Sequence, residues 1–270
     1  MQGITLLTKT EGKDVIKFLF ELADSNKVEA VLMKHDYGNS LCVSTEVGCN
    51  MGCAFCESGR LKKVRHLETY EMVEQILLVE NDIKERISSD NYDSVIDFIS
   101  IINSGKGIDI GARHITVSTC GIVPKIEAFM EDGKQVNLAI SLHAPNNQLR
   151  NQLMPVNQAY PIEQLIAVLK KYIEKTNRRV TFEYILLESV NDTDACAFEL
   201  AQLLKGMNCY VNLIPYNETS HIEFKKSSKE TIMRFYDILK KNKINVTIRK
   251  EFGRKVMAAC GQLRSNYEEA

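Results

Sequence analysis

Apolar and polar residues alternate along this chain in a pattern that predicts strands first and then strands interleaved with helices. Residues 15–34 carry two apolar runs around Asp24-Ser25-Asn26, which predicts a β-hairpin, and residues 40–48 predict another strand. From Thr69 onwards, apolar residues spaced three and four apart predict helices between further strands. Repeated strand and helix units are typical of an α/β fold with a parallel sheet, open or curled into a barrel, whose chemistry gathers at the carboxyl ends of its strands.

The expected elements follow one another in a regular order. Thr69 is expected to cap one helix, Pro161 to open another, and Ser227 with Glu230 to form the capping box of a helix that reaches about residue 241. The other helices are expected over 124–131 and up to Gly206, and the strands over 114–120, 136–144, 180–188, 209–217 and 244–252.

One place interrupts this alternation. Between a helix that ends near Arg86 and a helix that begins near Tyr92 the chain has only residues 87–91, Ile-Ser-Ser-Asp-Asn. This segment is too short and too polar for a strand with its two loops. Because a parallel strand is normally reached through a crossover connection, two successive helices indicate that one barrel strand is missing here.

Composition narrows the class of protein. With 270 residues, of which 44% are hydrophobic, the chain can build a large core. It has no apolar run of about 18 residues and no signal-peptide pattern, so we expect a cytoplasmic protein without a membrane partner. Eight cysteines in such a chain favour reduced thiols for metal binding or catalysis over a disulfide framework. The net charge of −1 gives no overall sign of a nucleic-acid partner, and a local excess of basic residues between Lys240 and Arg264 is weak evidence for one.

Three cysteines stand within eight residues, in the segment Cys49-Asn50-Met51-Gly52-Cys53-Ala54-Phe55-Cys56. A closed zinc site takes four protein ligands, and the cysteines downstream are scattered singly. Three thiolates on one loop suit a [4Fe-4S] cluster that keeps one iron open for a small molecule. The motif alone leaves a zinc-binding or adventitious loop as the alternative.

The spacing of these cysteines, with an aromatic residue before the third, resembles the radical S-adenosylmethionine (SAM) superfamily. The chain is further similar, in order from about residue 13 to 264, to the bacterial radical SAM methyltransferases that modify carbon 2 of an adenine in 23S rRNA and, in some members, in tRNA. The stretches that carry this resemblance are SLCVSTEVGCNMGCAFCESG, ARHITVSTCGIVPKI, SLHAPNNQLRNQLMPVN, VTFEYILLESVND, VNLIPYN and AACGQLR.

The resemblance implies a fold, cofactors and partners. The fold would be a partial (β/α) barrel over residues 39–265, with an N-terminal β-hairpin extension over 1–38 and a tail over 266–270. The cofactors would be a [4Fe-4S] cluster and SAM. The partners would be 23S rRNA or tRNA and an electron donor such as flavodoxin or ferredoxin, with the protein itself a monomer.

The resemblance also assigns site residues by position. The cluster ligands would be Cys49, Cys53 and Cys56, and the SAM contacts would be Ser118, Ser141, Leu142, His143 and Asn217. In the family, one SAM methylates a cysteine, here Cys260, and a radical from a second SAM activates that methyl group so that it adds to adenine. Glu29 would then remove the ring proton, and Cys42 would attack the tethering sulfur to form a transient disulfide.

Each of these residues also has an ordinary structural reading. Cys42 and Cys260 could be small core residues, and Glu29 could be an exposed acid in a hairpin. The polar SAM contacts could simply bond to neighbouring loop backbone. We expect Cys120, Cys196 and Cys209 to serve packing.

The chain also departs from the family pattern. From the resemblance we expect that the strand that ends in a Gly-Glu-Pro motif and holds the amino group of SAM is missing at residues 87–91, and that the usual N-terminal helical domain is absent. Arg254 and Lys255 stand where members tend to have an acid near Cys260. Three functions therefore remain open: a carbon 2 RNA methyltransferase, an impaired or truncated paralogue that binds a cluster or RNA, and a methyltransferase acting on adenine carbon 8.

Overall fold

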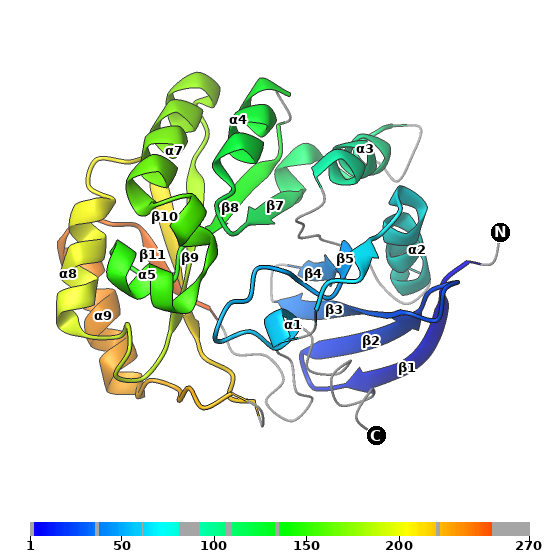
Figure 1. The fold of residues 1–270 in the computed structure, drawn as a ribbon, viewed down its shortest axis with the longest axis horizontal. Coiled ribbons are helices and arrows are strands. Elements are labelled where there is room, and N and C mark those ends of the chain that lie inside the picture. The colour runs from blue at the N-terminus through cyan, green and yellow to red at the C-terminus, as the bar shows by residue number, and fades with distance from the viewer. Residues whose placement is uncertain are drawn as a thin grey trace. The chain divides into compact units, whose positions relative to one another are not determined.

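The computed structural model describes residues 3–35, 38–60, 62–80, 92–105, 110–132, 135–219 and 222–249. The chain divides into two compact units, both drawn in Figure 1. Unit 1 comprises Met1–Asn50, Cys56–Val117 and Glu251–Ala270, and unit 2 comprises Met51–Phe55 and Ser118–Lys250.

Unit 1 is built on a four-stranded antiparallel sheet in which strands adjacent in sequence are paired. Its strands are β1 (Thr5–Glu11), β2 (Val15–Glu21), β3 (Lys27–His35) and β4 (Gly38–Val43). The predicted hairpin turn is confirmed: Ser25 has a φ of 63°, and the Asn26 N–H donates to Asp24 Oδ1 at 3.1 Å. Strand β1 was not predicted, because its side chains are mostly polar and none is fully buried.

The strand expected over 40–48 is interrupted after Val43. Gln75 of helix α2 (Thr69–Glu80) explains the break, because its Nε2 donates to the Ser44 carbonyl and its Oε1 accepts from the Ser44 N–H, both at 3.0 Å. The short strand β5 (Glu46–Val47) pairs instead with β6 (Arg65–His66).

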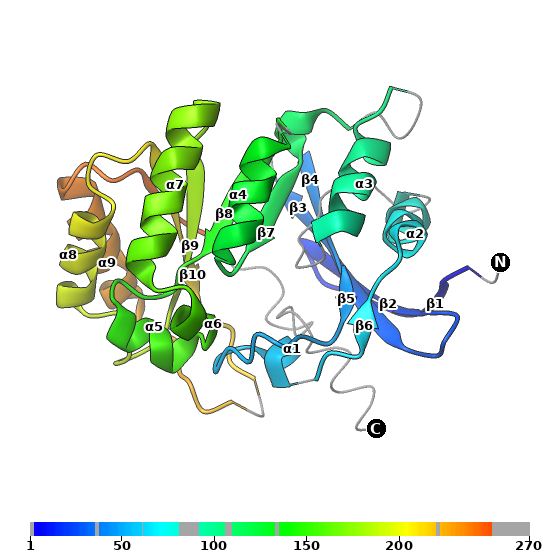
Figure 2. The same cartoon turned by 45° about the horizontal axis from the view of Figure 1, so that its top comes forward.

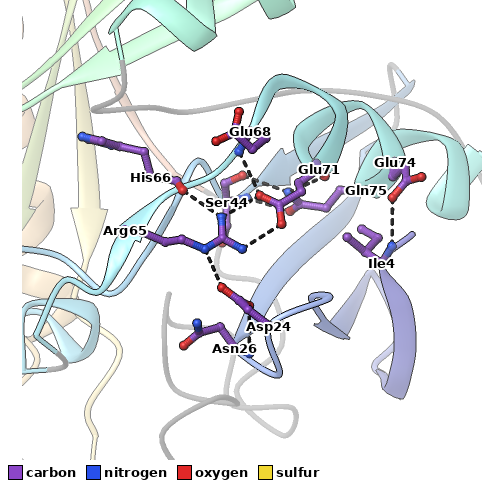
Figure 3. A network of polar contacts seen from close by, with 10 residues as sticks. All are labelled: Ile4, Asp24, Asn26, Ser44, Arg65, His66, Glu68, Glu71, Glu74 and Gln75. Atoms are coloured by element: carbon purple, nitrogen blue, oxygen red, sulfur yellow. Dashed lines mark hydrogen bonds and ion pairs between the residues drawn. The ribbon is translucent and has the colours of Figure 1, made fainter. Parts of the chain in front are cut away.

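Helix α2 begins at Thr69 itself, so the prediction that Thr69 caps it is wrong. The carboxylate of Glu71, in the first turn, accepts the Glu68 N–H at 2.8 Å. The same carboxylate accepts two bonds from Arg65, at 2.7 and 2.8 Å, and Arg65 also donates to Asp24 at 2.6 Å. Figure 3 shows how these side chains face one another. These charged contacts tie together the β2–β3 turn, β6 and the start of α2. Strand β6 follows the cysteine loop in sequence.

Unit 2 carries a five-stranded sheet in the order β11-β10-β9-β8-β7, and its β8 to β11 pairs are parallel. The strands are β7 (Thr116–Thr119), β8 (Asn137–Ser141), β9 (Val180–Leu186), β10 (Cys209–Pro215) and β11 (Val246–Ile248). The predicted α/β fold with a parallel sheet is confirmed, and among the described strands the sheet is open and does not close into a barrel.

Helices connect these strands and cover one face of the sheet, as Figures 1 and 2 show. Tyr184 of β9 marks this face, because its ring lies 5.2 Å from the ring of Phe235 in α9. The helices of unit 2 are α4 (Val123–Glu131), α5 (Asn147–Leu153), α6 (Val156–Ala159), α7 (Ile162–Thr176), α8 (Asp194–Leu203) and α9 (Lys229–Lys241). Unit 1 adds α1 (Glu57–Arg60), α3 (Tyr92–Ile102) and the 3₁₀ helix η1 (Ala112–His114).

The capping box predicted for α9 is wrong by one residue. Ser228 is the N-cap, and its Oγ accepts the Thr231 N–H at 3.1 Å. Ser227 is buried, and its Oγ has no hydrogen-bond partner among the described residues.

The segment 87–91, in which a strand is predicted to be missing, lies outside the described residues. Within the described strands, β4 and β7 are edge strands of two different sheets. Among the described residues, no helix is long and apolar enough to cross a membrane.

Candidate functional site

The predicted SAM contacts gather at the end of the unit 2 sheet where the strands have their carboxyl ends. Ser141 ends β8, Leu142 and His143 follow it directly, and Asn217 stands two residues beyond β10. Because β8 and β10 both run parallel to β9, their carboxyl ends meet at the same edge. Ser118 lies in the neighbouring edge strand β7. The structure therefore brings these five residues to one end of the sheet, while their role as SAM contacts stays a prediction.

A polar row crosses the sheet at the level of Ser141. Ser141 pairs in register with Glu183, Glu183 with Asn212, and Asn212 with Thr247. Because side chains alternate along a strand, Glu183 points to the face opposite Tyr184 and the helices. Asn212 Nδ2 donates to Glu183 Oε2 at 2.8 Å, and burial raises the pKa of Glu183. Glu183 and Asn212 were not predicted as site residues from the sequence, although polar residues alternate with core residues in β9 and β10.

His143 is held in one orientation and one charge state. Its φ is 58°, its Nδ1 accepts the Ile185 N–H at 3.0 Å, and its carbonyl accepts from Asn191 Nδ2 at 2.8 Å. Burial, with a smaller contribution from Arg150, lowers its pKa from 6.5 to about 3. The ring is therefore neutral near pH 7, and because Nδ1 accepts, its proton lies on Nε2, which makes Nε2 a donor.

The middle of the cysteine loop, residues 51–55, packs on unit 2 near the same sheet edge. The Ala54 N–H donates to the Leu153 carbonyl at 3.0 Å. The rings of Phe55 and His143 pack in a T-shaped arrangement, with their centroids 4.9 Å apart. Cys53 packs against a buried apolar cluster made of Leu153, Met154, Leu187 and Tyr216. Cys53 therefore lies in the same unit as the predicted SAM contacts. Phe55, two residues further along the loop, contacts one of them, His143.

The three loop cysteines have the chemistry that an iron-sulfur cluster needs. All three side chains are half-buried, so the thiols are sheltered but reachable. Gly48 and Gly52 have φ values of 73° and 60°, and these turns let the backbone present thiols at short spacing. The donor set fits a [4Fe-4S] cluster. Among the described side chains, no group of three or more His, Cys, Asp or Glu is arranged as a metal site.

Cys120 and Arg150 also belong to this end of unit 2, and sequence analysis assigned a site role to neither. Cys120 Sγ lies 3.2 Å from Met51 Sδ of the cysteine loop. Arg150 is completely buried and donates to the carbonyls of Cys120, at 2.6 Å, and Leu142, at 3.2 Å. In contrast, burial raises the pKa of the Cys196 and Cys209 thiols, which agrees with their expected packing role.

Glu29 and Cys42 lie on one face of the sheet in unit 1. Cys42 pairs with Val31, and Glu29 is two residues before Val31 on the same strand, so all three side chains point the same way. Lys17, which pairs with Val31 from the other side, is completely buried and forms an ion pair with Glu29 at 3.2 Å. The alternative that Glu29 is an exposed hairpin acid is wrong, because only 8% of the residue is exposed. Cys260, with Arg254 and Lys255, lies outside the described residues.

The sequence and fold match known proteins. The family model of the Radical SAM superfamily matches residues 43–200. A "Probable dual-specificity RNA methyltransferase RlmN" of Spiroplasma citri is 52% identical over 99% of this chain and 81% of its own length. The protein with the same description in Enterococcus faecalis is 55% identical over 94% of this chain and 77% of its own length. A solved radical SAM methyltransferase from Sphaerobacter thermophilus has a TM-score of 0.92 at 40% identity and covers 97% of this chain and 81% of its own.

The fold and the cysteine motif define a radical SAM enzyme, and the chain belongs, within that superfamily, to the family of RlmN-type methyltransferases. The cofactors of this class are a [4Fe-4S] cluster and SAM.

Proposed function

We propose that this chain methylates carbon 2 of an adenine in 23S rRNA, and in tRNA, through a methylated Cys260. About half of its residues are identical to those of relatives described as dual-specificity RNA methyltransferases. The observation that carries the proposal further is the shared sheet face of Glu29 and Cys42, because a base and a second thiol must act on the same adduct. Flavodoxin or ferredoxin is the proposed electron donor.

Each of the proposed site residues has a distinct role. When bound, the cluster and SAM supply the carbon radical that makes a methyl group reactive toward an electron-poor ring carbon. Cys260 would carry the methyl group as a thioether. Once the new bond to carbon 2 has formed, the adduct would lose its unpaired electron, which the oxidised cluster would accept, and its carbon 2 proton, which Glu29 would remove. The Cys42 thiolate then attacks the Cys260 sulfur, so that a disulfide forms, the sulfur–carbon bond breaks and the released carbon takes up a proton.

The test is anaerobic reconstitution of the full chain, followed by incubation with SAM, a reductant and ribosomal RNA. We expect 2-methyladenosine by mass spectrometry from the unchanged chain. Glu29→Gln and Cys42→Ser should each accumulate RNA covalently held by the protein, and Cys260→Ser should form no such adduct. Product methylated at carbon 8 would contradict the proposed carbon 2 position and support the carbon 8 alternative. An adduct in Cys260→Ser would refute the role of that thiol.

A second candidate is an impaired relative that binds a cluster or RNA without efficient methylation. The match to the S. citri relative spans 282 positions, more than the 270 residues of this chain, so the relative has internal residues without a counterpart here. This difference supports the interpretation that a strand and its Gly-Glu-Pro motif are missing. Formation of 5′-deoxyadenosine from SAM separates the candidates, because only an active enzyme produces it.

A further inference from the structure

Arg150 is a buried cation that lacks a carboxylate partner in the described structure. Its side chain is completely buried. The groups that accept from its guanidinium are all neutral oxygens: the carbonyls of Cys120, Ser141 and Leu142, at 2.6, 3.3 and 3.2 Å, and Asn157 Oδ1 at 3.0 Å. These bonds use four of the five N–H donors of the guanidinium, but they do not neutralise its charge. A buried charge is costly unless an anion compensates it, so an anion is expected nearby.

The position of Arg150 is fixed from several sides. Asn157, which accepts from Nη1, is itself held by bonds from its Nδ2 to Asn147 and Asn151 at 3.0 and 2.7 Å. Gly121 follows the carbonyl that accepts from Nη2, and its φ is 101°. A Cβ at Gly121 would lie 3.3 Å from Nη2 and 3.0 Å from Leu165 Cδ2, so a side chain at this position would crowd both neighbours.

The cysteine loop supplies the place for the anion. Ala54 of that loop bonds to Leu153, one helical turn beyond Arg150 in α5, and Cys53 packs on the same helix end. Negative charge on the sulfur of Cys53 or Cys120 would be close enough to interact with the Arg150 guanidinium. A [4Fe-4S] cluster held by three thiolates is an anion, and it gains a further negative charge when it is reduced.

We propose that Arg150 is a positioning residue that provides the counter-charge of the cluster and raises its reduction potential. The inference rests on the proposed ligation of the cluster by Cys49, Cys53 and Cys56. A fixed positive charge in a low-dielectric interior stabilises the reduced cluster more than the oxidised one. Arg150 therefore makes reduction of the cluster more favourable. It also bonds to carbonyls at the carboxyl ends of β7 and β8.

The test is an anaerobic redox titration of the reconstituted full chain, without SAM or RNA, followed by the electron paramagnetic resonance signal of the reduced cluster. Arg150→Gln removes the charge and keeps an amide donor, whereas Arg150→Lys keeps the charge with fewer hydrogen bonds. Arg178→Gln is the matched control, because Arg178 bonds to Gln135 and Asn137 at the opposite end of the sheet. We expect Arg150→Gln to make reduction at least about tenfold less favourable, a downward shift of about 59 mV, and the other two variants to stay near the unchanged chain.

A second variant covers the case in which Arg150→Gln does not fold. Asn157→Asp leaves Arg150 in place and puts a carboxylate beside Nη1, so it should lower the potential in the same direction. An unchanged potential in Asn157→Asp or in Arg150→Gln overturns the inference, and so does an equal shift in Arg150→Lys and Arg150→Gln, which would assign the effect to lost hydrogen bonds. An unchanged chain that takes up no cluster would instead refute the cysteine ligation, and the inference with it.

Discussion

At the scale of single residues, the described structure buries Lys17 and Glu29 as an ion pair and His143 as a neutral ring, whereas Arg150 is buried without a carboxylate partner. Lys17 and Glu29 are buried in the sheet of unit 1, where their ion pair replaces the hydration that each charge has in water. His143 avoids a charge altogether, because burial favours the neutral ring. Both arrangements make the stability of the fold sensitive to changes that alter charge without altering size.

Replacing Lys17 by Met should destabilise the protein strongly, because the Glu29 carboxylate would be left buried without its cation. Removing one partner of a buried pair typically costs about 3 to 5 kcal/mol. Urea unfolding of Lys17→Met, Glu29→Gln and the double variant measures the coupling. The double variant should be more stable than Lys17→Met, and a double variant that is no more stable would show that the pair is not energetically coupled.

His143 should make stability depend on pH. Its folded pKa of about 3 lies below the ordinary 6.5, so below about pH 6.5 the unfolded chain binds a proton that the folded chain excludes. The free energy of unfolding should therefore fall by about 1.4 kcal/mol per unit as the pH drops from about 6.5 toward 3. His143→Asn keeps an acceptor and tolerates a positive φ, so it is the matched variant. Urea unfolding of both proteins at several pH values should show this loss only in the unchanged chain, and parallel curves would contradict it.

At the scale of elements, apolar periodicity predicted those strands and helices whose two faces differ most. β9 alternates buried and half-buried residues along its whole length, and α7 buries one apolar side, so both were predictable. α5 was not, because its sequence Asn-Gln-Leu-Arg-Asn-Gln-Leu is mostly polar. It forms where Asn146 caps it, accepting the Leu149 N–H at 3.0 Å, and where Arg150 donates to the carbonyls of Leu142 and Cys120, which directly follow β8 and β7. The bond from Arg150 to Cys120 joins residues 30 positions apart, and no local pattern reports it.

The same limit applies to the site. The three loop cysteines were visible because they stand close together in sequence. The pair of Lys17 with Glu29 and the row from Ser141 to Thr247 depend on strand register, which alternation alone does not specify between distant strands.

The corrected helix cap gives a sharp test at this scale. Ser228→Ala removes the bond to the Thr231 N–H and should cost about 1 kcal/mol. Ser227→Ala is its neighbouring control and should cost little, because it deletes a buried hydroxyl that has no partner among the described residues. Thermal or urea unfolding of the two variants decides, and equal losses would mean that Ser228 is not the residue that caps α9.

At the scale of the whole molecule, the prediction of an absent strand concerns activity more than folding. In the family, the Gly-Glu-Pro motif holds the amino group of SAM, and losing a charge-assisted hydrogen bond costs roughly 1.5 to 3 kcal/mol. We expect the chain to methylate adenine weakly, and insertion of the strand and motif between Ile87 and Asn91 to increase methylation by about 10- to 100-fold. Mass spectrometry of ribosomal RNA from cells without another such enzyme measures both. Full methylation by the unmodified chain would show that the gap is tolerated.

Each described sheet pairs only strands that are consecutive in the chain, from β1 to β4, from β5 to β6 and from β7 to β11. During synthesis on the ribosome, each of these strands can therefore dock on a partner that has already emerged. No described strand must wait, with exposed backbone groups, for a distant segment still to be translated, which shortens the time in which it could pair with another chain. The order of these sheets thus favours assembly from the N-terminus onward at the pace of translation.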